Sequence, residues 1–376
     1  MAEHPSLAVV GMSIRSTCGV HDHADVLAAE LTREGVACSS HWLVRTDGSL
    51  AGSRAEVRGW LGSVTGELRR ERPDAILLHY SVFSYSHRGV PLFVHPVLSA
   101  LAGAGAPVIG MLHEFAYPWN YGGARGAVWA VTQRAVMLEL MRACSSAIVT
   151  TDWRASWLRT RPWLPKRPVL MAPVFSNLPA PSPAAPRHRP GPVIGLFGYS
   201  YQGAAVSLVL DALRRVRATD GGARLLLLGA PGPDSSAGEA WTAGAAQRGM
   251  QEALSFTGPL AAQEISDAIA GCDILLFADT AGPSPRKGSL AGSLASGRPV
   301  LALDGKHTWP ELVRADAARV VDATPQALAD ALAVMLADPG GLDELGARGR
   351  AFAESEMSIG STARAVRELI ALPAGS

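Results

Sequence analysis

The sequence has few features that would tie it to disulfides or to a metal. Only four of its 376 residues are cysteines, and they lie far apart, without CxxC or Cys/His ligand spacing: Cys18, Cys38, Cys144 and Cys272. This spacing argues against a zinc site and against a disulfide framework. We therefore expect a reducing, cytoplasmic environment.

Charge and long apolar runs are scarce as well. The formal net charge is +1, so no global field exists to hold a nucleic acid, and any anion must be bound by a local cluster of cations. No apolar run approaches the roughly 18 residues that span a bilayer, and residues 1–16 lack the basic and apolar regions of a signal peptide. We expect no nucleic-acid partner and no transmembrane segment; contact with a membrane surface and the oligomeric state stay open.

Short apolar runs followed by helix-like stretches are abundant instead. Such runs are typical of parallel strands that are covered on both faces. A first series comprises residues 7–12, 75–80, 107–112, 146–151 and 168–173. A second series comprises residues 193–198, 224–230, 253–258, 273–279, 299–305 and 318–321. The helical pattern is clearest at 23–36, 206–216 and 262–272.

A proline-rich stretch, LPAPSPAAPRHRPGP at 178–192, separates the two series and indicates an interdomain linker. A chain of this length fits two domains of roughly 150 to 200 residues each. The sequence therefore predicts an α/β fold with two Rossmann-like, doubly wound domains facing a central cleft. In such sheets, ligands bind at the carboxyl ends of the strands.

Three common nucleotide or hydrolase signatures are missing. The chain holds no GxxxxGK[ST], no GxGxxG after its first strand and no GxSxG. A P-loop NTPase, a classical NAD-binding protein and a nucleophile-elbow hydrolase are therefore disfavoured.

A series of motifs follows along the chain: residues 16–36, 72–80, 110–119 (GMLHEFAYPW), 145–158, 172–177 (APVFSN), 256–277 and 293–302 (SLASGRPVLA). In this order and spacing they resemble the family-4 glycosyltransferases of the GT-B fold, which transfer a sugar from a nucleotide-sugar donor with retention of anomeric configuration. The resemblance covers nearly the whole chain. It implies an acceptor domain at 1–178, a donor domain at 192–350 and, within 351–376, a last helix that packs back on the first domain.

The sequence departs from this family at charged positions. The family's Glu-x7-Glu pair falls on Ser284 and Gly292. The Arg and Lys that neutralise the donor diphosphate in the family fall near Tyr199 and Ala204. Both sets of charged side chains are missing here.

A loop with two cations offers a replacement. Arg286 and Lys287 directly precede an expected helix that opens with the amides of Gly288, Ser289 and Leu290. Burying a diphosphate without partners costs several kcal/mol, whereas a guanidinium, an ammonium and free amides all bind phosphate oxygens. We predict that this loop neutralises the donor diphosphate. A subset of the resembled family carries a similar loop in place of the glutamates.

Further candidates follow from the resemblance. A histidine at the position of His113 contacts the transferred sugar in the family, and we expect Glu114 to orient the acceptor; capping or loop packing is the alternative for both. Gly19 is expected to let a donor phosphate approach, with a plain turn as the alternative. His21, Asp22 and His23 are nearly consecutive and lack a partner motif, so we expect no metal and no other cofactor.

The remaining candidates lie in loops. For the donor, the resemblance implies Ser176, Asn177, Gly198, Tyr199, Thr257, Gly258 and Leu260, with turns and caps as the alternative. For the acceptor, it implies Tyr85, His87, Arg88 and Trp119, with a solvated loop or ordinary packing as the alternative.

The resemblance thus implies a retaining, metal-independent glycosyltransferase whose partners are a nucleoside-diphosphate sugar and an unidentified acceptor, a cell-envelope saccharide or a specialised metabolite. Ala/Arg/Gly-rich usage is compatible with a GC-rich bacterial source. Two alternatives stay open. One is a non-catalytic GT-B protein that binds a nucleotide-sugar or partners an active transferase, which the missing glutamates favour. The other is a GT-B sugar-nucleotide epimerase. Arg286, Lys287 and His113 favour the enzyme.

Overall fold

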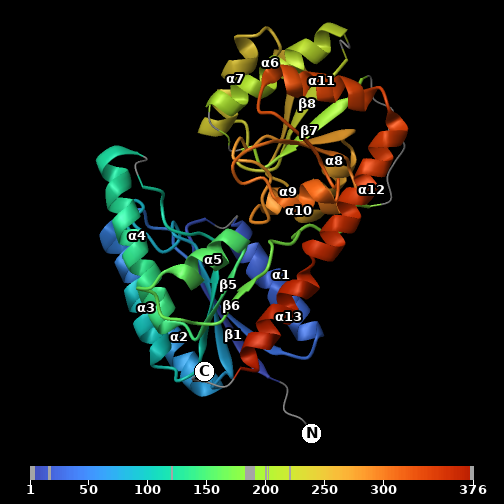
Figure 1. Ribbon diagram of the computed structural model, residues 1–376. Helices are drawn as coiled ribbons and strands as arrows, with labels where there is room; N and C mark the ends of the chain where they lie inside the picture. Colours follow the sequence, from blue (N-terminus) through green and yellow to red (C-terminus); the bar gives the residue numbers. More distant parts are fainter. Residues whose placement is uncertain are drawn as a thin grey trace. The chain divides into compact units, whose positions relative to one another are not determined.

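The computed structural model (Figure 1) describes residues 5–15, 18–119, 122–182, 191–199, 201, 203–219 and 222–372. The chain divides into two compact units. The first unit comprises Met1–Pro173 together with Ile359–Ser376, and the second comprises Val174–Ser358. The predicted linker at 178–192 therefore begins inside the second unit, and its residues 183–190 lie outside the described residues.

The first unit alternates strands and helices. In chain order these are β1 (Ser6–Ser13), α1 (Gly19–Arg33), β2 (Ala37–Val44), α2 (Leu50–Glu71), β3 (Ala75–Tyr80), α3 (Val94–Ala102), β4 (Val108–Leu112), α4 (Gly123–Ala143), β5 (Ser146–Val149), α5 (Asp152–Thr160), β6 (Val169–Met171) and, from the end of the chain, α13 (Ile359–Ile370). The strands form one parallel sheet in the order β2-β1-β3-β4-β5-β6.

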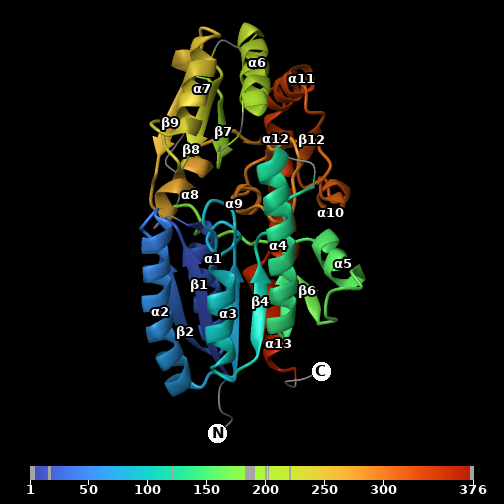
Figure 2. The same cartoon turned by 90° about the vertical axis from the view of Figure 1, so that its left-hand side faces the viewer.

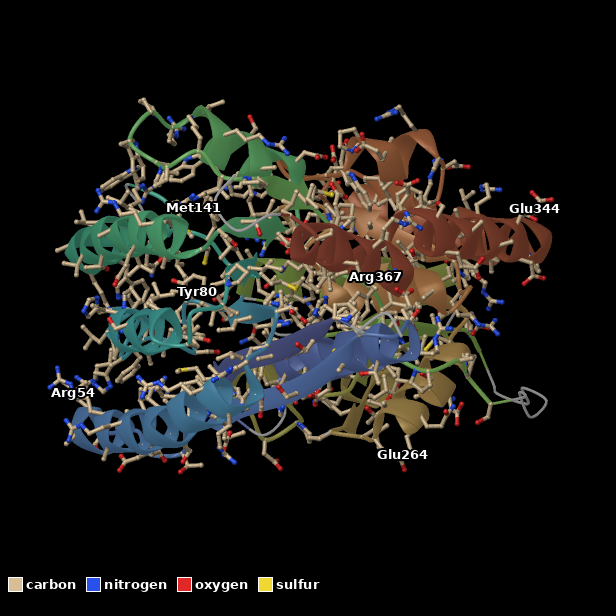
Figure 3. All side chains as sticks on the ribbon, turned by 90° about the horizontal axis from the view of Figure 1, so that it is seen from below. Arg54, Tyr80, Met141, Glu264, Glu344 and Arg367 are labelled. Atoms are coloured by element: carbon tan, nitrogen blue, oxygen red, sulfur yellow. The ribbon has the colours of Figure 1, made fainter. Side chains whose placement is uncertain are left out.

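Both faces of this first sheet are covered by helices. Helices α2, α3 and α4 lie side by side over one face (Figure 2), and α1 and α13 pack against each other on the opposite face. Successive residues of a strand point to opposite faces, so Ile76 and Leu78 belong to the core under α2–α4, as does the fully buried Tyr80 in the interior of this unit (Figure 3). This two-sided burial explains why β3 reads as an uninterrupted apolar run.

The second unit repeats the plan. It contains β7 (Val193–Phe197), α6 (Gly203–Thr219), β8 (Arg224–Leu228), α7 (Ser236–Ala246), a short 3-10 turn (Gln251–Ala253), β9 (Leu254–Gly258), α8 (Ala262–Ala270), β10 (Ile274–Phe277), α9 (Gly288–Ala295), β11 (Val300–Leu303), α10 (Pro310–Arg314), β12 (Arg319–Val321), α11 (Pro325–Leu336) and α12 (Pro339–Glu356). Its parallel sheet has the order β12-β11-β10-β7-β8-β9.

Two separate cores lie on the faces of the second sheet. Alternate strand residues such as Ile194 and Leu276 join a core with α6, α7 and α11. Their neighbours, such as Val193 and Leu275, join a core with α8, α9, α10 and α12. The predicted α/β class with two doubly wound parallel sheets is confirmed.

The strand orders locate a switch point in each sheet. The winding reverses between β1 and β3 in the first sheet and between β7 and β10 in the second. Ligands of open parallel sheets bind beside the carboxyl ends of the strands at such points. The loops that follow these four strands are therefore the places to search for a site.

Two further findings bear on the sequence predictions. β2 was not among the predicted strands: it is an edge strand, ACSSHWLV, whose side chains are mostly half-buried or exposed. Among the described residues, no helix combines the length and the apolar character needed to cross a bilayer.

The return of α13 to the first unit generates a stability prediction. Val366 of α13 is fully buried, whereas Arg364, two residues earlier, is exposed. We expect Val366→Asp to lower the free energy of unfolding of the first unit by several kcal/mol, because it buries an unpaired carboxylate, and Arg364→Asp to change it by less than about 0.5 kcal/mol. Chemical denaturation of both variants measures this, and equal stabilities would show that α13 contributes little to the first unit.

Candidate functional site

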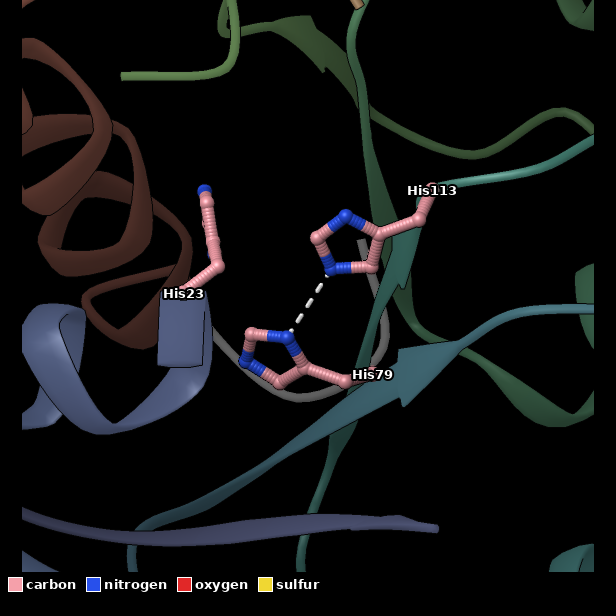
Figure 4. Close-up of side chains that lie close together, drawn as sticks. All are labelled: His23, His79 and His113. Carbon is pink, nitrogen blue, oxygen red and sulfur yellow. Dashed lines mark hydrogen bonds between the residues drawn. The ribbon is translucent and has the colours of Figure 1, made fainter. Parts of the chain in front are cut away.

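Three histidines meet at the carboxyl edge of the first sheet (Figure 4). His79 lies in β3, His113 directly follows β4, and His23 lies in the second turn of α1. His79 Nδ1 and His113 Nε2 are 3.0 Å apart and share a hydrogen bond. The ring of His23 stands edge-on to that of His113, with centroids 5.0 Å apart.

All three imidazoles are held in the neutral form. Burial, followed by the charge of Arg154, lowers the pKa of His113 to about 4. Burial, followed by the neighbouring imidazoles, holds the pKa values of His79 and His23 well below the usual 6.5. Neutral imidazoles each carry one donor and one acceptor nitrogen, so the cluster offers hydrogen bonds and no charge at neutral pH.

The same three side chains are close enough together to be considered as metal ligands. One nitrogen from each ring lies within 4.8 Å of the others. Two nitrogens on one tetrahedral zinc, at 2.0–2.1 Å from the ion, stand about 3.4 Å apart, and His79 and His113 already bond to each other. A metal would therefore require the rings to move, and the expectation of a metal-free site stays a prediction.

His113 and Glu114 are fixed by buried polar contacts. Arg154, only 4% exposed, donates from Nη1 to the His113 carbonyl oxygen and to Thr150 Oγ1, at 3.0 Å each. Glu114 Oε2 accepts a hydrogen bond from Ser81 Oγ at 2.9 Å. Glu114 thus ties the loop after β3 to the end of β4, which is the loop-packing alternative named from the sequence.

The predicted acceptor residues divide into buried and exposed ones. Tyr85 is fully buried, and its hydroxyl donates to the His79 carbonyl oxygen at 3.0 Å, which favours the alternative of ordinary packing over contact with an acceptor. His87 is half-buried and pairs with Val90 through its backbone. Arg88 is exposed, and Trp119 is 52% exposed with the Arg134 guanidinium 4.2 Å above its ring.

Gly19 opens α1 and is exposed. A Cβ built on it would meet no atom within 4 Å. Packing therefore does not require glycine here, and a role in approach to a phosphate stays a prediction.

The second candidate cluster lies at the switch point of the second sheet. Lys287 Nζ forms an ion pair with Asp279 Oδ2 at 2.9 Å, two residues after β10. Arg286 is half-buried beside them and adds to the positive field on Asp279. Burial alone would raise the pKa of Asp279, but the hydrogen bond and charge of Lys287 outweigh it, and the pKa is lowered.

Lys287 is also the N-cap of α9, so the amides of Gly288, Ser289 and Leu290 form the first turn. Within a helix such amides have no acceptor on the preceding turn, and they attract anions. The Leu290 side chain itself is buried in the core, so only its amide is available. Gly198, at the end of β7 with φ of 74°, lies against Ser289, whose Cβ would be 3.2 Å from an added Cβ.

Most other predicted donor residues have structural partners. The side chain of Tyr199 is fully buried, and its hydroxyl accepts the Gly232 amide at 2.7 Å, which favours a structural role over a contact with the donor. Thr257 Oγ1 accepts the Gly229 amide at 2.9 Å and donates to the carbonyl of Gly258, which has φ of 69°.

Three donor candidates remain. Leu260 is 38% exposed. Ser176 Oγ accepts the Leu178 amide at 3.2 Å, and Asn177 is half-buried. Residues 174–178 contact the loop that carries Arg286 and Lys287, called the cation loop below. The Val174 amide donates to the carbonyl oxygen of Pro285 in this loop at 2.8 Å.

Ser284 and Gly292 occupy the positions of the two glutamates of the resembled family. Ser284 is buried. A Cβ at Gly292 would lie 3.2 Å from both the Phe197 ring and the Leu178 methyl group. A side chain at 292 would therefore need Phe197 or Leu178 to shift by a few tenths of an ångström.

The geometry defines an α/β protein with two Rossmann-like units, and in the second unit Arg286 and Lys287 lie beside the first turn of α9. Residues 191–338 match the family of group 1 glycosyl transferases. Comparison with curated protein sequences gives no match.

Solved structures share the fold over nearly the whole chain. Sucrose-phosphate synthase from Thermosynechococcus elongatus has a TM-score of 0.69 at 14% identity, covering 97% of this chain and 98% of that one. WaaG, a glycosyltransferase involved in lipopolysaccharide biosynthesis, has 0.68 at 14%, covering 98% and 100%. Anabaena HepE in complex with UDP has 0.66 at 15%, covering 96% and 99%. The fold is GT-B, and with the family match it supports a GT-B glycosyltransferase.

The neutral histidines generate a pH prediction. Below about pH 6.5 the unfolded chain binds protons that the folded cluster does not, down to about pH 4 in the case of His113. The free energy of unfolding therefore falls as the pH falls, by up to about 1.4 kcal/mol per pH unit and histidine. Well above pH 6.5 the histidines are neutral in both the folded and the unfolded chain, so they no longer lower the free energy of unfolding. Denaturant titrations at pH 7 and pH 5 measure it. We expect His79→Phe to reduce the pH dependence and Val334→Ala, at a 69% exposed residue without a titratable group, to leave it unchanged; an equal dependence in all three proteins would contradict neutral burial.

Proposed function

We propose that the protein is a retaining glycosyltransferase that moves a sugar from a nucleoside-diphosphate sugar to a nucleophilic group of an acceptor. The observation that carries the proposal is the corner at the switch point of the second sheet. There, Arg286, Lys287 and the open amides of α9 converge beside the carboxyl ends of β7 and β10. The known complex of HepE contains UDP, which makes UDP-sugars the first donors to test.

In this proposal the corner stabilises the departing diphosphate. Negative charge grows on the leaving group in the transition state, and fixed cations and amides placed there lower the barrier without reorganising. Arg286 supplies a planar fork and Lys287 a point charge. Asp279 holds Lys287 in place before the donor binds, and its negative charge weakens the field of the lysine. Arg286 therefore contributes the larger share of the stabilisation of the departing diphosphate.

The first unit holds the acceptor in this proposal. His113, held neutral and oriented by His79, contacts a hydroxyl of the transferred sugar, as the resemblance implies. The acceptor proton passes to a donor phosphate oxygen on the same face of the sugar, which retains the anomeric configuration. No metal is needed, because Arg286, Lys287 and the helix amides supply the positive charge.

A second candidate is a non-catalytic nucleotide-sugar binder. The specific observation that favours it is the replacement of both family glutamates, with the Phe197 ring beside Gly292. Release of nucleoside diphosphate that requires both donor and acceptor separates the enzyme from this binder. Conversion of the donor alone indicates an epimerase.

The proposal predicts a large loss of turnover in Arg286→Ala. We expect kcat to fall about 100-fold, because removal of one donor that stabilises transition-state charge has this effect, while the midpoint of thermal unfolding stays near that of the wild type. Arg314→Ala, at a 70% exposed side chain of the same unit, is the matched control. Initial rates of nucleoside-diphosphate release, with and without EDTA, give the measurement.

Two results would contradict the proposal. Wild-type turnover in Arg286→Ala removes the role of the cation loop. Loss of activity with EDTA, restored by a divalent metal, removes the metal-free mechanism.

A further inference from the structure

A cavity lies at the carboxyl edge of the first sheet, beside its switch point. It has a volume of about 440 Å³. Its walls come from the residues after β1, β2 and β3 and from the first turns of α4. Three arginines line it: Arg45, Arg88 and Arg125.

Arg45 is a buried cation with neutral partners. It is 5% exposed, and it donates to Ser53 Oγ and to the carbonyl oxygens of Ser84 and Ser86 at 2.8–3.2 Å. These bonds use four of its five N–H groups. These hydrogen-bond partners are neutral, and the charge of the nearby Glu56 carboxylate also acts on Arg45, so only part of the arginine's charge is balanced within the wall of the cavity.

Arg88 and Arg125 add exposed cations on a rigid support. The Arg88 backbone is in the left-handed region, with φ of 50°, and its carbonyl accepts Trp129 Nε1–H at 3.0 Å. A Cβ at Gly89 would meet the Trp129 ring at 2.3 Å. The loop after β3 can therefore pack against α4 in this way only with glycine at position 89. The Arg125 guanidinium lies 4.7 Å above the ring of Trp129.

Apolar and acidic groups complete the wall. Ile14 and Phe83 are each 48% exposed and face the cavity beside Trp129. Asp47 is the single acidic residue among the described lining residues, and its Oδ1 accepts the Ser49 amide at 2.7 Å. The three lining arginines therefore outnumber the two nearby carboxylates, Asp47 in the wall and Glu56 behind it, and Glu56 already accepts the Thr46 and Asp47 amides.

We propose that this cavity binds the acceptor and that the acceptor is an organic anion, with a phosphate or carboxylate held by the arginines and an apolar or aromatic body held by Trp129 and Phe83. The inference rests on the proposed function, because it assigns a substrate class to the first unit of a transferase. Guanidinium forks match both oxyanions, and the experiment below distinguishes them.

The test is isothermal titration calorimetry of the full chain with benzyl phosphate, phenylacetate and benzyl alcohol. We expect at least one anion to bind about ten-fold or more tightly than the neutral alcohol, and the tighter of the two names the acceptor group. Arg88→Ala and Arg125→Ala should each weaken that anion about ten-fold, the usual effect of one charge-assisted hydrogen bond. Arg70→Ala, exposed in the last turn of α2, should bind like the wild type.

The inference is overturned if the alcohol binds as well as the anions, if neither anion binds, or if the Arg88 and Arg125 variants bind like the wild type. UDP titrated into the same samples separates this inference from the proposed function. Binding of UDP without binding of the anions ends only the acceptor assignment. If the anions bind and UDP does not, a UDP-sugar is excluded as the donor, whereas the assignment of the cavity to an anionic ligand is kept.

Discussion

The parallel arrangement of the strands is the constraint on which the site depends. Because every strand in each unit runs the same way, the loops that follow the strands emerge at one edge of each sheet. The winding reverses once in each sheet, so two neighbouring loops diverge there. The histidine cluster and the arginine cavity lie at this edge of the first sheet, and the cation loop lies beside the reversal of the second.

Electrostatics then determines what each edge can hold. The chain as a whole is nearly neutral, and its cations act only where they are gathered. In the second unit the Lys287–Asp279 pair keeps the ammonium beside the first turn of α9. In the first unit Arg45 and Arg154 are buried among neutral oxygen partners, and the histidines remain uncharged. The two edges are therefore suited to different ligands: a diphosphate at one, and an acceptor with its sugar-hydroxyl contact at the other.

Much of this arrangement could be predicted from the sequence. Buried parallel strands such as residues 75–80 are uninterrupted apolar runs, and the pattern sufficed to place them. β2 was missed because an edge strand with polar residues on both sides lacks that signal.

The site was less accessible to sequence reasoning. The hydrogen bond between His79 and His113 joins residues 34 positions apart, and no local pattern reveals it. Tyr85 and Tyr199 were predicted to face ligands, but the loops fold back and bury both rings. Asp279 could have been noticed, because it is an acidic residue that ends the strand pattern at 273–279; its pairing with Lys287 could be seen only in the fold.

The most direct test of the account is calorimetric titration of the wild-type protein with UDP, GDP, TDP and ADP, each beside its parent nucleoside. The account predicts that at least one nucleoside diphosphate binds, that its nucleoside binds far more weakly, and that the difference shrinks as salt is added. Equal affinity for diphosphate and nucleoside, or binding of none of the four, would contradict it.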